Sequence, residues 1–249
     1  RGGYGNKHFA TSVNKTPRFA KPGLPGTEGV FELEVKIIAD VGLVGYPNAG
    51  KSTLLHSISR ARPTIANYAF TTLHPNIGTV QFRDHHSLSV ADIPGLVDGA
   101  SENVGLGHGF LKHIERTKVL LFVLDASGTH FKSTTCKKTL RMDLPLPEIP
   151  AVVAYLNLKR ELELYDPKLL EKPRLVVLNK TDLLLVMEDG ASKLQALTEE
   201  LHRHEPHLAV FSMAANNEAS APAMQDMVQY LRQVVGQVEE QQGVTNLPK

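Results

Sequence analysis

A glycine-rich stretch in the first third of the chain has the residues needed to bind phosphate groups. Residues 45–52 read Gly-Tyr-Pro-Asn-Ala-Gly-Lys-Ser, which matches the pattern G-x-x-x-x-G-K-[ST]. The glycines permit a tight turn whose backbone N–H groups can point at phosphate oxygens. Lys51 would bridge the β- and γ-phosphates of a nucleotide, and the Ser52 hydroxyl would bind Mg²⁺. A chance match in an ordinary turn is the alternative, which the strand and helix expected on either side disfavour. The residues expected to contact the nucleotide here are Gly45, Tyr46, Pro47, Asn48, Ala49, Gly50, Lys51, Ser52 and Thr53.

Further along the chain, an aspartate and a threonine could complete the magnesium site. Asp92 and Gly95 belong to a D-x-x-G sequence that follows the short apolar run 87–91. Asp92 could reach the metal through water, and the Gly95 N–H could bind the γ-phosphate. Between the two motifs, we expect Thr72 to bind Mg²⁺ when the γ-phosphate is present, with Thr71 as second choice. Such a threonine couples the order of its loop to the state of the nucleotide.

A third polar motif could select guanine. Asn179-Lys-Thr-Asp182 follows the apolar run 175–178. The Asp182 carboxylate can accept from both N1–H and the exocyclic amine of guanine, whereas adenine would leave it unpaired. Asn179 would face the imidazole side of the base and tie this loop to the phosphate loop. Lys180 would lay its methylene stem along the base plane. A polar strand-to-helix turn is the alternative. Backbone groups of three further residues should complete the base pocket: Ser212, Met213 and Ala214.

These motifs need a scaffold that brings the ends of several strands together. Apolar runs alternate with helix-like segments, which predicts an α/β fold with a mainly parallel, six-stranded sheet and helices on both faces. Ligands of such sheets bind at the carboxyl ends of the strands, where the motifs fall. The expected strands are 40–45, 78–82, 88–91, 119–124, 175–178 and 208–211, with a further one at 30–38. The expected helices are 52–60, 106–116, 156–165, 192–204 and 224–238.

The composition suggests one main domain with appendages. Residues 1–38 begin with Gly- and Pro-rich sequence that has too few apolar residues for a core. We assign the nucleotide-binding domain to 39–240, with a basic, proline-containing insertion at 127–150, and a polar tail to 241–249. The chain has 249 residues, a net charge of +1 and one cysteine, so neither a disulfide framework nor a generally basic surface is expected. No apolar run is long enough to span a membrane.

Beyond the individual motifs, the sequence resembles the Obg family of P-loop GTPases. The segments that carry the resemblance are 42–54, 70–73, 91–96 and 113–116, and the stretches 5–14 and 22–26 resemble the end of that family's Gly-rich N-terminal domain. The resemblance implies a GTP- and GDP-binding, Mg²⁺-dependent, monomeric switch that acts on the large ribosomal subunit and its rRNA during late assembly. A GTP-dependent module that binds a protein partner away from the ribosome is the alternative.

Several features depart from the family's pattern. Most of the family's Gly-rich domain is absent from this sequence, and the insertion at 127–150 is not typical of the family. Its Lys137, Lys138 and Arg141 are candidates for rRNA phosphate contacts, although a solvated loop is the commoner fate of such a run. Met213 stands where the family usually has Ala, which could perturb guanine affinity. Bacterial members are usually acidic, so the mild basicity favours a mitochondrial matrix protein over a cytoplasmic one.

The residues around the γ-phosphate predict slow hydrolysis. Leu96 stands where many GTPases place a water-orienting Gln, and its aliphatic side chain cannot orient water. No arginine is evidently placed as an internal arginine finger; Arg116 and Lys118 are candidates by position alone, and a solvated helix end is the favoured alternative. We hypothesise that Asn48 instead recruits K⁺, although it could equally be a turn-stabilising residue. The expected catalytic set is Lys51, Asn48, Thr72 and Gly95.

Overall fold

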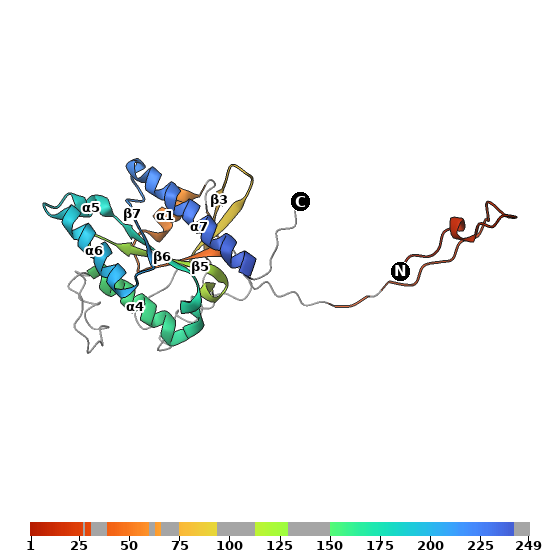
Figure 1. Ribbon diagram of the computed structural model, residues 1–249, viewed down its shortest axis with the longest axis horizontal. Coiled ribbons are helices and arrows are strands. Elements are labelled where there is room, and N and C mark those ends of the chain that lie inside the picture. The colour runs from red at the N-terminus through yellow and green to blue at the C-terminus, as the bar shows by residue number, and fades with distance from the viewer. Residues whose placement is uncertain are drawn as a thin grey trace. The chain divides into compact units, whose positions relative to one another are not determined.

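The computed structural model describes residues 1–26, 28–30, 39–59, 63–65, 75–93, 113–128 and 150–241 (Figure 1). The chain divides into two compact units, Arg1–Val35 and Lys36–Lys249. In the first unit, two extended runs lie side by side, since the Lys21 N–H donates to the Tyr4 carbonyl at 2.9 Å. This unit also contains the short 3-10 helix η1 (Asn6–Phe9) and a contact between the rings of Phe9 and Phe19.

Seven strands of the described residues form one sheet in the second unit, in the order β2-β3-β4-β1-β5-β6-β7. Neighbouring strands from β4 to β7 pair in parallel, whereas β2–β3 and β3–β4 pair antiparallel. The prediction of a mainly parallel sheet is confirmed, and the two-residue strand β2 adds a seventh member that no periodic pattern could signal. The strands are β1 (Ala39–Val44), β2 (Thr64–Ile65), β3 (Asn76–Gln81), β4 (Ser87–Asp92), β5 (Thr117–Asp125), β6 (Arg174–Asn179) and β7 (Ala209–Ser212).

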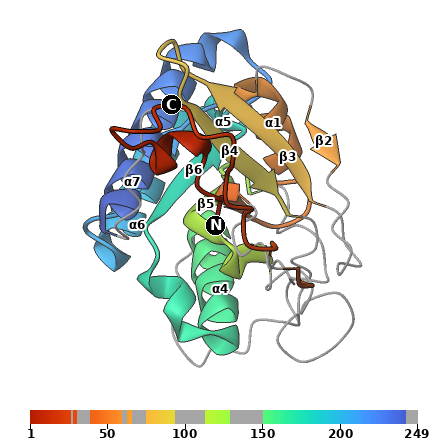
Figure 2. The same ribbon diagram turned by 90° about the vertical axis from the view of Figure 1, so that its right-hand side faces the viewer.

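Helices cover both faces of this sheet (Figures 1 and 2). On one face, apolar side chains of α1 and α7 pack against the strands; on the other, those of α4 and α6 do so. The central strand β5 is therefore buried along its length except at Lys118, as expected of a strand covered on both faces. The helices are α1 (Lys51–Ile58), α4 (Pro150–Tyr165), α5 (Thr181–Leu185), α6 (Gly190–His204) and α7 (Ala221–Gln241), joined by the 3-10 helices η4 (Pro167–Glu171) and η5 (Glu218–Ser220).

Two boundaries differ from the sequence prediction. Helix α4 starts at Pro150, the last residue of the expected insertion, and not at the expected start near Leu156. Proline suits the first turn of a helix because its fixed φ is helical and its missing N–H would have no partner there. Of the predicted helix 106–116, only the end is described, and residues 113–115 are helical. The predicted strand 30–38 and most of the insertion lie outside the described residues. None of the described helices is long and apolar enough to cross a membrane.

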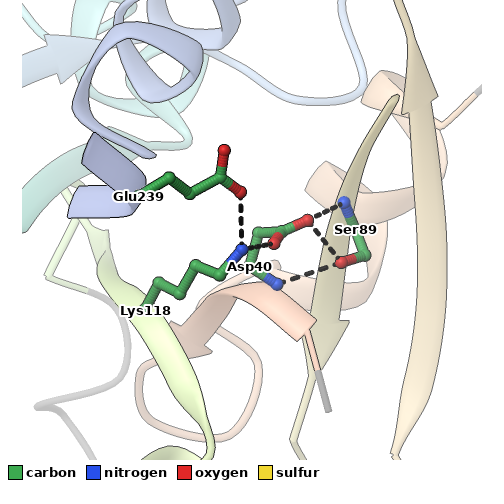
Figure 3. A network of polar contacts seen from close by, with 4 residues as sticks. All are labelled: Asp40, Ser89, Lys118 and Glu239. Carbon is green, nitrogen blue, oxygen red and sulfur yellow. Dashed lines mark hydrogen bonds and ion pairs between the residues drawn. The ribbon is translucent and has the colours of Figure 1, made fainter. Parts of the chain in front are cut away.

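A polar network ties the end of α7 to the amino ends of three strands (Figure 3). Lys118 of β5 donates to Asp40 of β1 and to Glu239 of α7, both at 2.7 Å. The other Asp40 carboxylate oxygen accepts from the N–H and the hydroxyl of Ser89 in β4. Burial by itself would raise the pKa of Asp40, but the hydrogen bonds from Lys118 and Ser89 outweigh it and hold that pKa below its ordinary value. The charged form of Asp40 therefore stabilises the folded domain.

We expect Asp40→Asn to lower the free energy of unfolding by about 1–3 kcal/mol near neutral pH, because Lys118 would lose a charged partner. A carboxyl group with a depressed pKa contributes stability that is complete above its ordinary pKa of 3.8 and is lost as the pH falls through the folded-state value. The difference between wild type and variant should therefore shrink at acid pH. Urea unfolding between about pH 3 and 7 measures this.

Asp84→Asn is the matched control, since it removes the carboxylate of the exposed Asp84–Arg232 pair. Exposed pairs contribute little, so this control should unfold like the wild type. A pH-independent effect of Asp40→Asn would contradict the stabilising role of the Asp40 charge.

Candidate nucleotide-binding site

The predicted phosphate loop connects β1 to α1, as its position in the sequence required. Gly50 adopts φ 96°, in the left-handed region that favours glycine, and Asn48 adopts φ 62°. A Cβ atom on Gly50 would lie 2.1 Å from the Asn179 side-chain nitrogen, and one on Gly45 would lie 2.4 Å from the Val123 carbonyl oxygen. Both ends of the loop thus require glycine because other groups approach the backbone closely.

Lys51 is held inside this loop. Its Nζ donates to the carbonyl oxygens of Gly45 and Tyr46 at 2.9 and 3.2 Å. Burial lowers the pKa of Lys51, although the nearby charge of Asp92 opposes this effect. A partly buried ammonium group beside a turn of backbone N–H groups is suited to binding an anion such as a phosphate.

The two predicted magnesium residues that the structure describes are in direct contact. The Ser52 hydroxyl, in the first turn of α1, donates to Asp92 Oδ2 at the end of β4, at 2.5 Å. Asp92 is only 4% exposed, and its Oδ1 has no hydrogen-bond partner among the described residues. A buried carboxylate oxygen beside a hydroxyl is a donor set that a hard cation such as Mg²⁺ would satisfy. Thr72, Thr71, Gly95 and Leu96 lie outside the described residues.

Asn179 joins three loops at the carboxyl end of the sheet. Its side-chain amide donates to the Ala49 carbonyl of the phosphate loop at 2.9 Å, and its carbonyl oxygen accepts from the Ala215 N–H at 3.0 Å. Asn179 is only 3% exposed, so both hydrogen bonds are shielded from water. The predicted link between the base-binding loop and the phosphate loop is therefore present, with a second link to the loop after β7.

Asp182 has the free hydrogen-bonding capacity that guanine recognition needs. It lies in the first turn of α5, and its Oδ1 is buried without a hydrogen-bond partner among the described residues. The N1–H and exocyclic amine of guanine are donors that would satisfy a buried carboxylate, whereas adenine has no donor at N1.

The loop after β7 lies against this motif through its backbone. The Met213 carbonyl accepts from the Thr181 N–H at 3.3 Å, and the Met213 N–H donates to the Leu178 carbonyl at 2.9 Å. The Met213 side chain is 1% exposed and packs in the core with residues such as Met227. The Met213 side chain therefore fills the core and does not point at the base. Met at this position, where the family usually has Ala, then gives no steric reason for weaker guanine binding. Ser212 ends β7, and the Ala214 N–H donates to the Ser220 hydroxyl.

Two sequence-based assignments need correction. Lys118 lies at the start of β5, roughly 23 Å from Asp125 at the strand's nucleotide end, given about 3.3 Å per strand residue. Its ammonium group is bound to Asp40 and Glu239. Arg116 precedes the same end of β5. Neither residue is placed to act as an internal arginine finger, because both lie at the amino end of a parallel strand, whereas ligands bind at the carboxyl end.

Sequence reasoning missed Asp125, the last residue of β5. Its carboxylate binds the Lys180 ammonium group at 2.8 Å, inside the predicted base-binding motif. The available signal was a single acidic residue at the end of the buried run 119–124, directly where parallel strands deliver ligand-binding side chains. Thr53, which was also assigned to the nucleotide, has an exposed side chain in the first turn of α1.

A phosphate loop, a serine–aspartate pair and a carboxylate poised for guanine, together at one end of a parallel sheet, define a P-loop GTPase domain. A family model described as "50S ribosome-binding GTPase" matches residues 40–180. The chain is 48% identical over 195 residues to the GTPase Obg of Desulforamulus reducens, covering 78% of this chain and 42% of that protein. It is 52% identical over 183 residues to the GTPase Obg of Herpetosiphon aurantiacus, covering 74% and 38%. The chain belongs to the Obg family of P-loop GTPases. It spans less than half the length of these relatives.

Solved structures share the fold at low sequence identity. One is Era in complex with MgGDPNP and nucleotides 1506–1542 of 16S ribosomal RNA, with a TM-score of 0.50 at 22% identity over 78% of this chain and 56% of that one. Another is a nucleolar GTP-binding protein 1 of Plasmodium falciparum, with a TM-score of 0.50 at 18% identity over 82% and 92%. These similarities support the α/β GTPase fold alone.

We expect Gly50→Ala to weaken GDP binding by at least about 100-fold, because the new Cβ would displace the Asn179 amide and strain the loop. Titration calorimetry with GDP and Mg²⁺ measures the effect. Gly236→Ala is the matched control, since a Cβ on Gly236 meets no atom within 4 Å in helix α7. The control should bind GDP like the wild type and melt at an equal or higher temperature. Wild-type affinity in Gly50→Ala would contradict the close approach of Asn179.

Proposed function

We propose that this chain is the nucleotide-binding part of a Mg²⁺-dependent switch that binds GTP and hydrolyses it slowly. The observation that carries the proposal is the unpartnered, buried Oδ1 of Asp182, next to an Asn179 that is already bonded to the phosphate loop. An orphaned buried acceptor is costly, and a base that donates hydrogen bonds to this oxygen would remove that cost.

The described residues bind different parts of the nucleotide and its metal ion. The loop 45–50 presents backbone N–H groups, and Lys51 places its charge beside them. Mg²⁺, when bound by Ser52 and through water by Asp92, supplies positive charge against the phosphate oxygens. Asp182 selects the base. The Ser52 hydroxyl donates its proton to Asp92 and keeps its oxygen lone pairs, so this oxygen would be able to bind the metal.

Slow hydrolysis follows from the absence of a water-orienting side chain at Leu96, and we propose K⁺ as a second cation that partly compensates. Asn48 is exposed at the phosphate loop, with the positive φ that Asn tolerates better than most residues. This geometry is compatible both with a turn-stabilising Asn and with a side-chain oxygen available to a cation.

For the biological role, we propose late assembly of the large ribosomal subunit. The description of the matching family as a "50S ribosome-binding GTPase" supports a partner in the large subunit. The rival proposal is a GTP-dependent module that binds a protein partner away from the ribosome. We further propose that the protein is a monomer in the mitochondrial matrix, with the cytoplasm as the alternative, on the basis of its mild basicity and the insertion at 127–150. Fractionation of cells that express the tagged full-length protein, and light scattering of the purified protein, test location and mass.

Pelleting with large ribosomal subunits separates the two roles. We expect the wild-type protein to pellet with large subunits in a non-hydrolysable GTP analogue and to be released in GDP. Asp182→Asn is a matched control. Xanthine carries a carbonyl in place of the guanine amine, and the Asn amide offers the donor and the acceptor that this base edge needs. This variant should pellet with the xanthosine analogue and not with the GTP analogue. Guanine-selective binding without any pelleting would favour the protein-binding module.

Replacing Na⁺ with K⁺ should raise the hydrolysis rate of the wild-type protein by about tenfold, the effect of roughly 1.4 kcal/mol of transition-state stabilisation. Asn48→Ala should remove this difference while GDP affinity stays within about threefold, because other loop groups bind the phosphates. Phosphate release in matched chloride buffers measures the rates. Equal rates in KCl and NaCl for the wild type would contradict the assignment of K⁺.

A further inference from the structure

Asp125 is fixed on both sides at the nucleotide end of β5. Its Oδ2 lies 2.8 Å from Lys180 Nζ. Its Oδ1 accepts from the Ser127 N–H at 3.0 Å and from the Ser127 hydroxyl at 2.5 Å. The Asp125 side chain is 6% exposed, and that of Lys180 is 27% exposed. Since both carboxylate oxygens are engaged, the carboxylate cannot turn away from the lysine without breaking other bonds.

The sheet aligns this ion pair with the base-binding motif. Asp125 is in register with Asn179 across β5 and β6, and the Ala126 N–H donates to the Asn179 carbonyl at 2.9 Å. Lys180 adopts φ 61°, in the left-handed region that few side chains favour. This backbone turn places Lys180 between Asn179 and the helix that carries Asp182, with its side chain directed to β5. A strained conformation of this kind persists only when surrounding contacts hold it.

We propose that Asp125 is a positioning residue for base recognition, which holds Lys180 in the place from which its methylene stem covers the guanine ring. The inference rests on the proposed guanine-nucleotide function and adds a residue from outside the binding motifs. Loss of the Asp125 charge leaves a partly buried ammonium group unpaired, and Lys180 then leaves this position to reach water. The base loses its cover, and bound GDP dissociates faster.

An ion pair that only stabilises the domain would behave differently. Asp125→Asn would then lower the melting temperature, while GDP would dissociate at the wild-type rate. Lys180→Met keeps an unbranched side chain of similar length without the charge, so it isolates the partner that Asp125 holds. Melting temperatures therefore separate positioning from general stability, and a double-mutant cycle of dissociation rates shows whether Asp125 acts on the nucleotide through Lys180.

The experiment measures the dissociation rate of a fluorescent GDP from wild type, Asp125→Asn, Lys180→Met and the double variant by stopped flow. We expect Asp125→Asn to dissociate GDP about tenfold faster, as for the loss of one charge-assisted contact. The double variant should differ from Lys180→Met by less than about twofold, because Asp125 has nothing left to position. Glu239→Gln, which removes part of the Lys118 network at the other end of the sheet, should keep the wild-type rate.

Three results would overturn the inference. One is a wild-type rate for Asp125→Asn, and another is a double variant whose effect is the product of the two single effects. If Asp125→Asn fails to fold, Ser127→Ala loosens the same carboxylate while keeping its charge. We expect GDP to dissociate from this variant about two- to threefold faster, which is roughly half the effect of Asp125→Asn in free energy. The third result that would overturn the inference is a wild-type dissociation rate for Ser127→Ala. Failure of the wild type to bind any guanine nucleotide would instead overturn the proposed function.

Discussion

The whole site depends on the two hydrogen bonds of the buried Asn179 amide. One binds the phosphate loop through Ala49, and the other binds the loop after β7 through Ala215. A buried amide with both ends satisfied resists displacement, since any shift would orphan a polar group away from water. Asn179 therefore holds the phosphate loop, its own loop and the loop after β7 at fixed distances from one another. The phosphate and base subsites must have a fixed separation if one rigid nucleotide is to fill both.

The surrounding sequence is adapted to this constraint. Gly50 has no side chain because the Asn179 amide occupies the space where a Cβ would lie. Met213 keeps its side chain in the core, and its backbone holds the loop next to Thr181. The ammonium group of Lys180 is anchored to Asp125 on the neighbouring strand. At this end of the sheet, Asp92 and Asp182 each keep one buried carboxylate oxygen without a partner among the described residues, where a cation and a guanine base would supply the missing partners.

Local motifs could be read from the sequence because their chemistry lies within a few consecutive residues. In the turn 45–52 and in the Asn179–Asp182 motif, the residues that act together are only a few positions apart. The alternation of strands and helices predicted the fold class. Contacts between distant residues could not be predicted in this way. Asp125 and Lys180 are 55 positions apart, and Lys118 and Glu239 are 121 apart. The order of residues indicated which end of the strand Lys118 and Asp125 occupy, but only the structure shows that they contact Glu239 and Lys180.

The central claim is that this end of the sheet binds guanine nucleotides and rejects adenine nucleotides. Competition between a labelled GDP and unlabelled ADP on the wild-type protein, with Mg²⁺ present, tests it most directly. A site with a buried carboxylate built for the guanine edge should reject the adenine analogue by about 10⁴-fold or more. We therefore expect tight GDP binding that a roughly thousandfold excess of ADP does not displace. Displacement by comparable concentrations of ADP, or no binding of GDP, would contradict it.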